Sequence, residues 1–472
     1  SYLSKSSSLF PVDDIKDSSF IVNNINNIVN NKEKFLLFTE LITDTRAKSE
    51  NLKISKPTIP STSQANELPK HIHIVHNANG SIELYNLLPF EVTVKNILFN
   101  GKALLDNEIV IDGISTNHSP TVIKTEYTGI RDEMFTAITE YMGNSRRTKN
   151  GVTIYSDQIH NPLLIDNWSD FNFIRNIANN SYEIREGLWT VNKPIIIEGN
   201  LRILSGANIN FSEDAYLIIK GALIAKGSKN KPIIFDSILD SWKGIYVLNA
   251  DKKSKLTNVY INNVTNLSDG ILNLTGGVNF YNSDVEFNNV KVISVKAEDA
   301  INFVKSEFLL NSVLIDSVVS DGIDSDFSDG IISNSKFANV GGDAMDFSGS
   351  RVLIENSHAI NIYDKAVSAG EGSLIKVENS FFENTGVGIA SKDGSEVNVK
   401  DTNIFNYTLF AGMSYLKKSF YDPPSITFNN CLTDGKRPYI RQIGTNMLVD
   451  FIDVPESDLS VTNLYQSGVM AK

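Results

Sequence analysis

The amino-acid sequence predicts a mainly β protein whose largest part is a parallel β-helix. Turn-forming residues recur every 22 or 23 positions in two columns, and the period contains no helix-length segment. Instead, each period holds short strands with β-branched residues at alternate positions. A fixed period of this kind indicates a solenoid in which every coil hydrogen-bonds to the next, about 4.8 Å away. The first column is Asn289, Asn311, Asn334, Asn356, Asn379 and Asp401, and the second is Asp316, Asn339, Asn361, Asn384 and Asn406.

The composition agrees with an extended repeat and narrows the choice of partner. The chain has 472 residues and is 41% hydrophobic, which exceeds one ordinary compact core. Its net charge of −12 argues against nucleic acid or an anionic membrane as the main partner, because both select basic surfaces. A single cysteine, Cys431, excludes an internal disulfide framework. No run of 18 apolar residues is present, so we predict no membrane span in this chain.

The first 69 residues are predicted to form an N-terminal helical segment followed by a linker. Apolar residues at helical spacing indicate the helix, and two prolines followed by a polar stretch indicate the linker. The chain begins at Ser1 rather than Met, and either a removed export signal or anchor, or a boundary chosen in cutting the sequence, accounts for this start. The apolar residues are Phe35, Leu36, Phe38, Leu41 and Ile42, and the prolines are Pro57 and Pro60.

Residues 70–196 are predicted to form a small β-rich domain. Apolar and polar residues alternate around Asn79-Gly80 and Asn100-Gly101, and both pairs favour tight hairpin turns. We expect a helix over residues 131–143, where the alternation weakens. Strand character returns after residue 182, and the β-helix is predicted over 197–435. Residues 436–472 lose the period, so we expect them to cap the open end of the solenoid.

Acidic residues gather at equivalent positions of neighbouring coils in the predicted β-helix. Aligned coils place Asp299, Asp321, Asp343 and Asp364 in one column, and Asn302, Asp324 and Asp346 in a second column three residues later. Like charges at coil spacing raise one another's pKa, and a hard cation such as Ca²⁺ would relieve the repulsion. Alternatively, these side chains cap turns and accept backbone N–H groups. The predicted Ca²⁺ ligands are Asp299, Asp321, Asp324, Asp326, Asp343 and Asp346.

Several motifs in this region resemble a known group of proteins. The segments "DSDFSDG", "GGDAMDFSGS" and "KKSFYDPPSI" lie in a stretch, 197–435, that resembles the right-handed parallel β-helix, or pectin-lyase-like, superfamily. They are most similar to the β-helix modules of bacterial envelope proteins, such as those attached to CotH-type domains. The resemblance implies an exported protein of the cell surface or periplasm that binds a polysaccharide or another cell-envelope component. A structural subunit of a surface layer or filament is an alternative, and the sequence does not predict the oligomeric state.

A second resemblance would make the protein an enzyme. The "DGID" step resembles the "DDG-aromatic-D" step of family 9 calcium-dependent pectate lyases, which implies a lyase or epimerase acting on uronate polymers, with Asp299, Asp321 and Asp324 as Ca²⁺ ligands. This chain departs from the pattern at two positions, where it has Ser320 and Ile323. The lysine expected in the Asp324 column is also missing, because our alignment places Asp346, Val367 and Ala390 there. Lys365 and Lys392 flank the column and are the candidate catalytic bases, so the enzyme hypothesis ranks second.

Overall fold

A computed structural model describes most of the chain beyond residue 71. The described residues are 72–77, 80–86, 91–113, 120–125, 135–141, 144–148, 154–155, 160–419, 421–466 and 470. The predicted N-terminal helix and linker, residues 1–69, lie outside them.

The region before residue 160 contains two small, mainly antiparallel sheets, as predicted. In the first, β2 pairs antiparallel with β1 and β6, while β9 pairs parallel with β1. In the second, β3 pairs antiparallel with β4, β5 and β7, and β7 continues to β8. The strands are β1 (Ile72–His76), β2 (Ser81–Asn86), β3 (Val92–Phe99), β4 (Lys102–Ala103), β5 (Ile109–Ile111), β6 (Thr121–Lys124), β7 (Phe135–Tyr141), β8 (Asn144–Thr148) and β9 (Ile154–Tyr155).

The helix expected over residues 131–143 was wrong, because this segment contains strand β7. Phe135, Ala137 and Thr139 are buried on one face, which is the two-residue alternation of a strand. Their backbone groups pair with β3, and Phe135 packs on the ring of Phe99 at 5.0 Å between centroids. Helix propensity here was outweighed by packing against a neighbouring strand.

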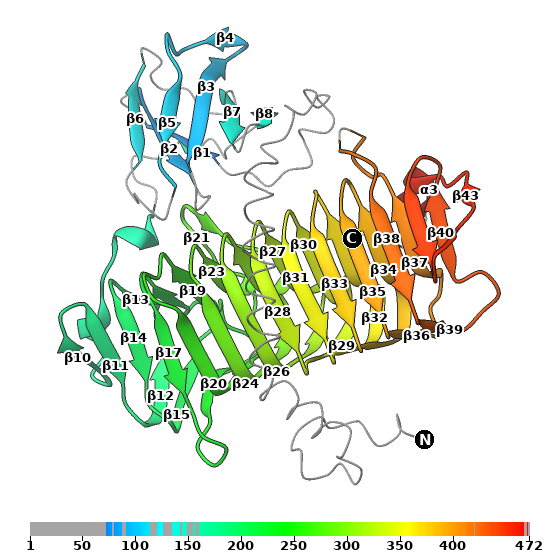
Figure 1. Cartoon of the computed structure of the whole chain (residues 1–472). Coiled ribbons are helices and arrows are strands. Elements are labelled where there is room, and N and C mark those ends of the chain that lie inside the picture. Colours follow the sequence, from blue (N-terminus) through cyan, green and yellow to red (C-terminus); the bar gives the residue numbers. More distant parts are fainter. Residues whose placement is uncertain are drawn as a thin grey trace. The chain divides into compact units, whose positions relative to one another are not determined.

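From residue 181 onward the chain winds into a parallel β-helix, in which three columns of strands form three sheets (Figure 1). The first sheet contains β11 (Ser181–Ile184), β14 (Asn200–Ile203), β17 (Leu223–Lys226), β28 (Asp329–Ser333), β31 (Arg351–Glu355), β33 (Leu374–Glu378), β35 (Glu396–Lys400), β38 (Ser425–Asn429) and β41 (Asn446–Val449). The second contains β12 (Gly187–Val191), β15 (Ala207–Phe211), β18 (Ile233–Ser237), β29 (Lys336–Val340), β36 (Asn403–Phe405) and β39 (Leu432–Thr433). The third contains β13 (Ile195–Ile197), β16 (Leu217–Ile219), β19 (Ile245–Leu248), β23 (Gly276–Tyr281), β25 (Asp299–Val304), β27 (Asp321–Asp326), β30 (Met345–Ser348), β37 (Phe410–Tyr415), β40 (Tyr439–Gln442) and β43 (Glu456–Ser457).

Five long strands pass from one sheet to the next without a break. β20 (Ser254–Asn262), β24 (Val285–Val295) and β26 (Glu307–Val318) join the first sheet to the second. β32 (His358–Gly370) and β34 (Phe381–Lys392) join the second sheet to the third. Parallel pairing therefore begins before residue 197 and continues past residue 435, to β43.

Shorter elements lie outside the three columns. Two 3₁₀ turns, η4 (Pro162–Leu164) and η5 (Trp168–Asp170), precede the antiparallel strand β10 (Ile174–Ala178). β21 (Ser268–Asp269) and β22 (Leu272–Asn273) form a hairpin, and β42 (Ile452–Asp453) turns back on β41. The helix α3 (Val461–Gln466) follows the last strand. Among the described residues, no helix has the length and apolar character needed to cross a membrane.

The predicted asparagine columns occupy two corners of the coil, where the backbone takes the left-handed conformation. In the second column, the Asn339 side chain donates to Asp316, Asn361 donates to Asn339, and Asn384 donates to Asn361, at 2.7–2.9 Å. Asparagine suits these corners because it tolerates positive φ and its amide can both donate and accept along the ladder.

One coil departs from both columns by a single residue. Ser312 and Ser317 hold the left-handed positions that the sequence alignment assigned to Asn311 and Asp316. The acidic and amide side chains still reach the ladders, since Asn334 donates to Asn311 at 2.8 Å. In the first column, Asn289, Asn334, Asn356, Asn379 and Asp401 have positive φ as expected.

The third corner is held by a serine ladder that the sequence analysis missed. The backbone N–H of each serine donates to the hydroxyl of the serine one coil later, over 22 or 23 residues, at 3.0–3.1 Å. These hydroxyls are buried, so the ladder satisfies backbone groups that water cannot reach. Its members are Ser283, Ser306, Ser328, Ser350, Ser373 and Ser395.

Candidate functional site

The third sheet is buried on both faces, unlike the first. Strands β31, β33 and β38 of the first sheet alternate between buried and partly exposed residues, whereas every residue of β13, β16, β19 and β25 is buried. Inward-facing residues such as Ile301 and Ile323 belong to the core of the solenoid. The side chains between them point outward, and other groups pack against them.

The outward positions of the third sheet change character along the solenoid. The backbone register places one residue per coil in a single row: three apolar residues, then five polar residues, then three apolar residues. The apolar residues are Ile196, Ile218 and Tyr246 at one end and Ala390, Met413 and Ile440 at the other. We call the five residues between them, Asn279, Asn302, Asp324, Asp346 and Ser368, the polar row.

Packed segments cover both ends of this row. At the N-terminal end, Leu267 and Ile271, near the β21–β22 hairpin, pack in one cluster with Ile218 and Tyr246. The C-terminal segment covers the other end, because residues of α3 and Met470 pack in a cluster with Ala390 and Met413. The polar row is therefore bounded on both sides by apolar contacts. Its centre is partly exposed at Asp324 and Asp346.

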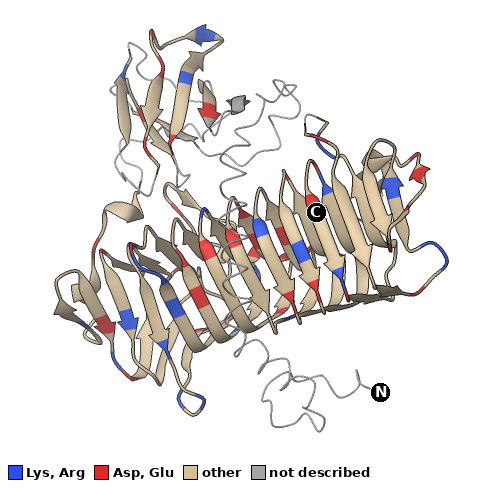
Figure 2. Ribbon diagram, viewed as in Figure 1, with Lys and Arg blue, Asp and Glu red and all other residues tan. Residues whose placement is uncertain are grey.

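The six aspartates predicted as Ca²⁺ ligands come from three adjacent coils of the third sheet, and acidic residues are visible on neighbouring strands in the middle of the solenoid (Figure 2). Asp299 lies beside Asp321, and the Asp321 carboxylate accepts the backbone N–H of Asp343 at 2.8 Å. Asp324 lies beside Asp346 and accepts an N–H from Asn302 at 3.1 Å. Asp326 occupies the next outward position, beside Ser348.

The sequence alignment was wrong by one residue in the coil after Asp346. The register between β32 and β34 shifts between Ile362 and Lys365, and this irregularity moves every following side chain by one position. Lys365, and not Asp364, therefore follows Asp343 in its column, where its backbone N–H donates to the Asp343 carboxylate at 2.9 Å. In the polar row, Ser368 takes the place that the alignment gave to Val367, which is buried in the core.

Lys365, the first candidate base, is buried between two carboxylates. Its Nζ lies 3.0 Å from Asp343 Oδ1 and 2.6 Å from Asp364 Oδ2. Burial alone would lower the pKa of Lys365, but the Asp343 and Asp364 carboxylates raise it above its usual value. Burial, together with the nearby Asp343 charge, raises the pKa of Asp364 to about 6. At neutral pH Lys365 is therefore a protonated partner of these two acids and cannot accept a proton.

Lys392, the second candidate base, lies at the other side of the polar row. Its Nζ is 3.7 Å from Asp346 Oδ1, and the residue is buried. Burial alone would lower its pKa, yet the Asp346 carboxylate, with smaller contributions from Tyr465 and Asp343, raises it well above the usual value. Both lysines thus neutralise aspartates of the third sheet.

A further charged group at the third corner was not predicted. Glu371 forms an ion pair with Lys418 and accepts the Ser348 hydroxyl at 2.8 Å. Although burial opposes ionisation, Lys418 and Lys392 lower the pKa of Glu371. The nearby Asp393 carboxylate accepts the backbone N–H groups of Lys417 and Lys418, each at 2.7 Å. The "DG" step at Asp393 and the "KK" pair were visible in the sequence, but nothing in it placed them side by side.

The C-terminal helix reaches the same region through two tyrosines. The hydroxyls of Tyr415, on β37, and Tyr465, on α3, lie 2.9 Å apart. Lys417 Nζ lies over the Tyr465 ring, 4.6 Å from its centroid. Because Tyr415 is fully buried, burial raises its pKa well above the usual value, with a further contribution from Tyr465.

The Ca²⁺ assignment stays a prediction. Within the described part of the chain, no three carboxylate, imidazole or thiol groups stand together as a metal-ligand set. Asp321 and Asp343 each accept at least one backbone N–H, as the turn-capping alternative expects.

Comparison with known proteins adds the family and little else. Residues 276–447 match the family described as the right handed beta helix region. No curated protein has a sequence that matches this chain.

Three solved structures are similar to parts of it. They are an alginate lyase from Paenibacillus sp. str. FPU-7 (14% identity, TM-score 0.31, covering 52% of this chain and 93% of that one), the Siphovirus 9NA tailspike receptor binding domain (12%, 0.34, 56% and 53%) and the catalytic domain of a GH87 alpha-1,3-glucanase in complex with nigerose (12%, 0.33, 77% and 90%). At these values, none of the three carries site residues or substrates over to this chain. The family match and the observed coils together identify the solenoid of this protein as a right-handed parallel β-helix.

Proposed function

We propose that this protein binds an extended polysaccharide along the polar row of the third sheet. The observation that carries the proposal is the change from apolar to polar and back along one row of outward positions. A structural sheet packed under covers would need apolar residues throughout, as at both ends. Five consecutive polar coils between two covered ends are the exception, and exceptions to the packing pattern mark functional sites.

The chemistry and spacing of the polar row suit a repeating, hydroxylated ligand. Carboxylates, amides and a hydroxyl recur about every 4.8 Å, over about 19 Å from the first to the fifth coil. Carboxylates accept hydrogen bonds from sugar hydroxyls, and amides both donate and accept them. Asp324, Asp326 and Asp346 are partly exposed, so a ligand can reach the centre of the row. A polymer that follows the solenoid axis would meet equivalent groups on successive coils.

The alternative of a uronate lyase or epimerase is less well supported by this geometry. Proton abstraction next to a carboxyl group requires an unprotonated base near the substrate carbon. Lys365 and Lys392 are both buried and held protonated by aspartates. We therefore rank binding above catalysis.

The proposal also places the protein outside the cytoplasm, at the surface or in the envelope of a bacterium. Its support is the resemblance of the β-helix motifs to modules of envelope proteins, together with a ligand class that occurs outside the cell. Immunoblotting of fractionated source cells tests this part. Signal in the envelope or medium is expected, and signal confined to the cytoplasm would refute it.

A glycan array, followed by calorimetry with the best ligand, tests the binding function. We expect the double variant Asp324→Asn/Asp346→Asn to weaken binding by about tenfold or more, since charged hydrogen-bond acceptors in the centre of the row are lost. The matched control is Glu378→Gln, on β33 of the first sheet, which should bind as the parent does. No binding to any polysaccharide, or equal loss in the control, would reject the proposal.

A further inference from the structure

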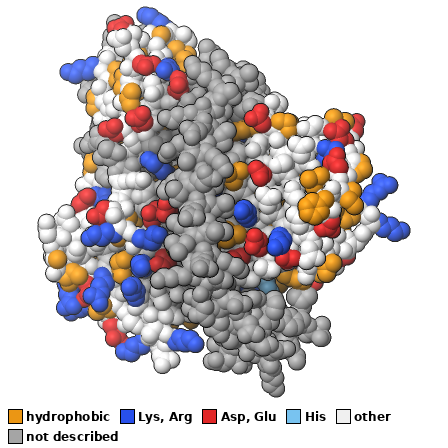
Figure 3. All heavy atoms as spheres, viewed as in Figure 1, with side chains coloured by type: hydrophobic (Ala, Val, Ile, Leu, Met, Phe, Trp, Pro, Cys, Tyr) orange, Lys and Arg blue, Asp and Glu red, His pale blue; other side chains and the backbone are white. Residues whose placement is uncertain are grey.

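The two ends of the solenoid differ from its flanks, because both expose large apolar side chains. At the N-terminal end, Ile177 on β10 and Leu188 on β12 are exposed, and Leu188 is 71% exposed. At the C-terminal end, Leu432, Phe451 and Ile452 are exposed, with Phe451 at 87%. Figure 3 shows hydrophobic side chains gathered over this C-terminal end. Apolar groups concentrated in this way indicate an interaction surface.

Phe451 is also strained. It follows Asp450 in the turn between β41 and β42, and both residues have positive φ, at +66° and +46°. A two-residue hairpin turn of this type favours Asn or Asp followed by Gly, because a bulky side chain at positive φ is costly. The protein therefore keeps an exposed aromatic ring at a position where glycine would be more stable. Strain that folding does not require points to a function for the side chain.

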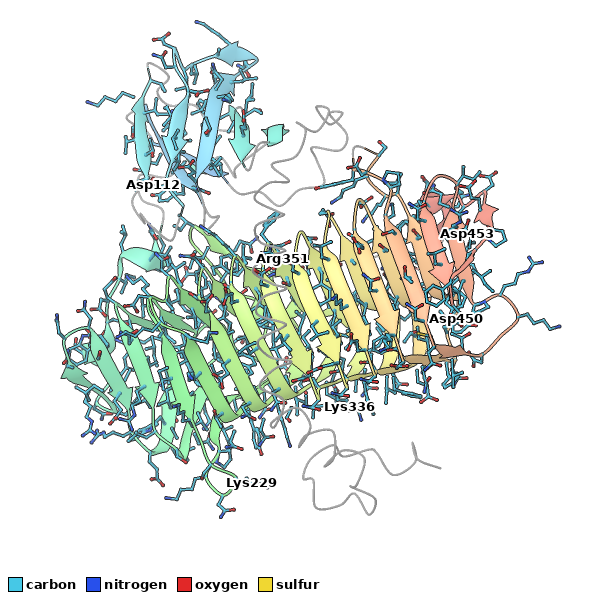
Figure 4. The ribbon with its side chains drawn as sticks, viewed as in Figure 1. Asp112, Lys229, Lys336, Arg351, Asp450 and Asp453 are labelled. Carbon is cyan, nitrogen blue, oxygen red and sulfur yellow. The ribbon has the colours of Figure 1, made fainter. Side chains whose placement is uncertain are left out.

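The charges at the two ends are complementary. At the N-terminal end, the exposed Arg175 and Arg202 share one buried acid, Glu183, at 2.5 and 3.6 Å. At the C-terminal end, the opposite arrangement occurs, since the exposed Asp453 and Glu456 share one buried base, Arg441, at 3.2 and 3.7 Å. Asp450 and Asp453 both lie at this end (Figure 4). One end thus carries a local excess of positive charge and the other a local excess of negative charge.

We propose that copies of this chain associate head to tail, with the C-terminal end of one β-helix against the N-terminal end of the next. The contact would bury Phe451 and Ile452 against Ile177 and Leu188, and it would bring Asp453 near Arg175. These two charged residues lie on β42 and β10, the terminal antiparallel strands of the first sheet. Because the two contacting surfaces differ, such an interface does not close on itself, and repeated contacts build a filament. This inference is independent of the glycan proposal.

Analytical ultracentrifugation of the full chain over a concentration series tests the association. The parent should form a series of species that grows with concentration, and Phe451→Asp should weaken the dissociation constant by about tenfold or more. Asp tolerates positive φ, so this variant should fold at least as well as the parent. The matched control is Leu239→Asp, which removes an equally exposed apolar residue from a loop on the flank of the solenoid and should leave association unchanged.

A charge-reversal pair tests the head-to-tail orientation. Arg175→Asp alone and Asp453→Arg alone should each associate at least about tenfold more weakly, because each places like charges opposite one another. Mixed together they should assemble again, since Asp at position 175 of one variant meets Arg at position 453 of the other. A parent that stays monomeric at every concentration would overturn the proposal. So would reversal variants that associate as the parent does, or a mixture that stays dissociated.

Discussion

The first and third sheets belong to the same coils but follow different rules. In the first sheet, inward residues are buried and outward residues meet solvent, where Arg351 forms a two-bonded ion pair with Asp329 at 2.6 and 2.7 Å (Figure 4). In the third sheet, both faces are buried, and the outward face includes the Asp343–Lys365–Asp364 ion cluster. The difference teaches that one repeating backbone can serve as a solvated wall on one side and a candidate binding surface on another.

Removing the buried cation of the third sheet should give the largest loss of stability. Lys365→Met leaves Asp343 and Asp364 buried without their partner, and breaking a buried ion pair in this way costs about 3–5 kcal/mol. Lys376→Met, on β33 of the first sheet, is the matched control and should change stability by less than about 0.5 kcal/mol. Urea denaturation measures both values. Equal effects at the two sites would contradict the distinction between the sheets.

The Ca²⁺ prediction concerns the third sheet only. If the six aspartates bind Ca²⁺, a concentration 100 times the dissociation constant should stabilise the fold by about 2.7 kcal/mol. Differential scanning calorimetry would then show a higher melting temperature with Ca²⁺, and the shift should be smaller in Asp324→Asn. An unchanged melting temperature at millimolar Ca²⁺ would leave hydrogen bonding to backbone N–H groups as the role of these side chains.

The pH dependence of stability should also single out the third sheet. The pKa of Asp364 is raised from 3.8 to about 6, so the folded protein holds this proton more tightly than the unfolded chain. Its contribution to stability is then fully present below pH 3.8 and is lost as the pH rises to about 6. Asp364→Asn cannot titrate there. The stability of the parent relative to this variant should fall across that interval, and a flat or rising difference would refute the assignment.

A corner residue should give the smallest effect. Asn361→Ala removes the hydrogen bonds to Asn339 and Asn384 and puts a less tolerant residue at positive φ, for a cost of about 1–2 kcal/mol. Asn361→Gly keeps the backbone conformation and should cost less. Chemical denaturation of the two variants separates the side-chain bonds from the backbone preference. An alanine variant as stable as the parent would show that the ladder contributes little.

The periodicity was sufficient to predict the solenoid, because corner residues such as Asn361 and Asn384 are fixed by a backbone requirement that repeats in every coil. The serine ladder carried the same 22–23-residue spacing, yet serine is common in many settings, and its spacing went unread. The register shift before Lys365 could not be predicted, because a one-residue irregularity leaves no mark in composition and reverses which side chains face outward.

The candidate site was predictable in part for the same reason. The grouping of Asp324 and Asp346 follows directly from the period. The ion pairs of Lys365 and Lys392 depend on the register shift and on side chains from different coils. The cover formed by α3 joins residues about 50 positions apart, as in the Tyr415–Tyr465 contact, and no local pattern encodes that distance.

Hydrogen–deuterium exchange with and without a bound oligosaccharide tests the central claim most directly, because every coil contributes both sheets to one experiment. We expect the ligand to slow exchange in β25, β27 and β30 of the third sheet, around Asn302, Asp324 and Asp346. Exchange in β28, β31 and β33 of the first sheet should stay unchanged. Protection confined to the first sheet or to the ends of the solenoid would contradict the assignment of the polar row as the binding surface.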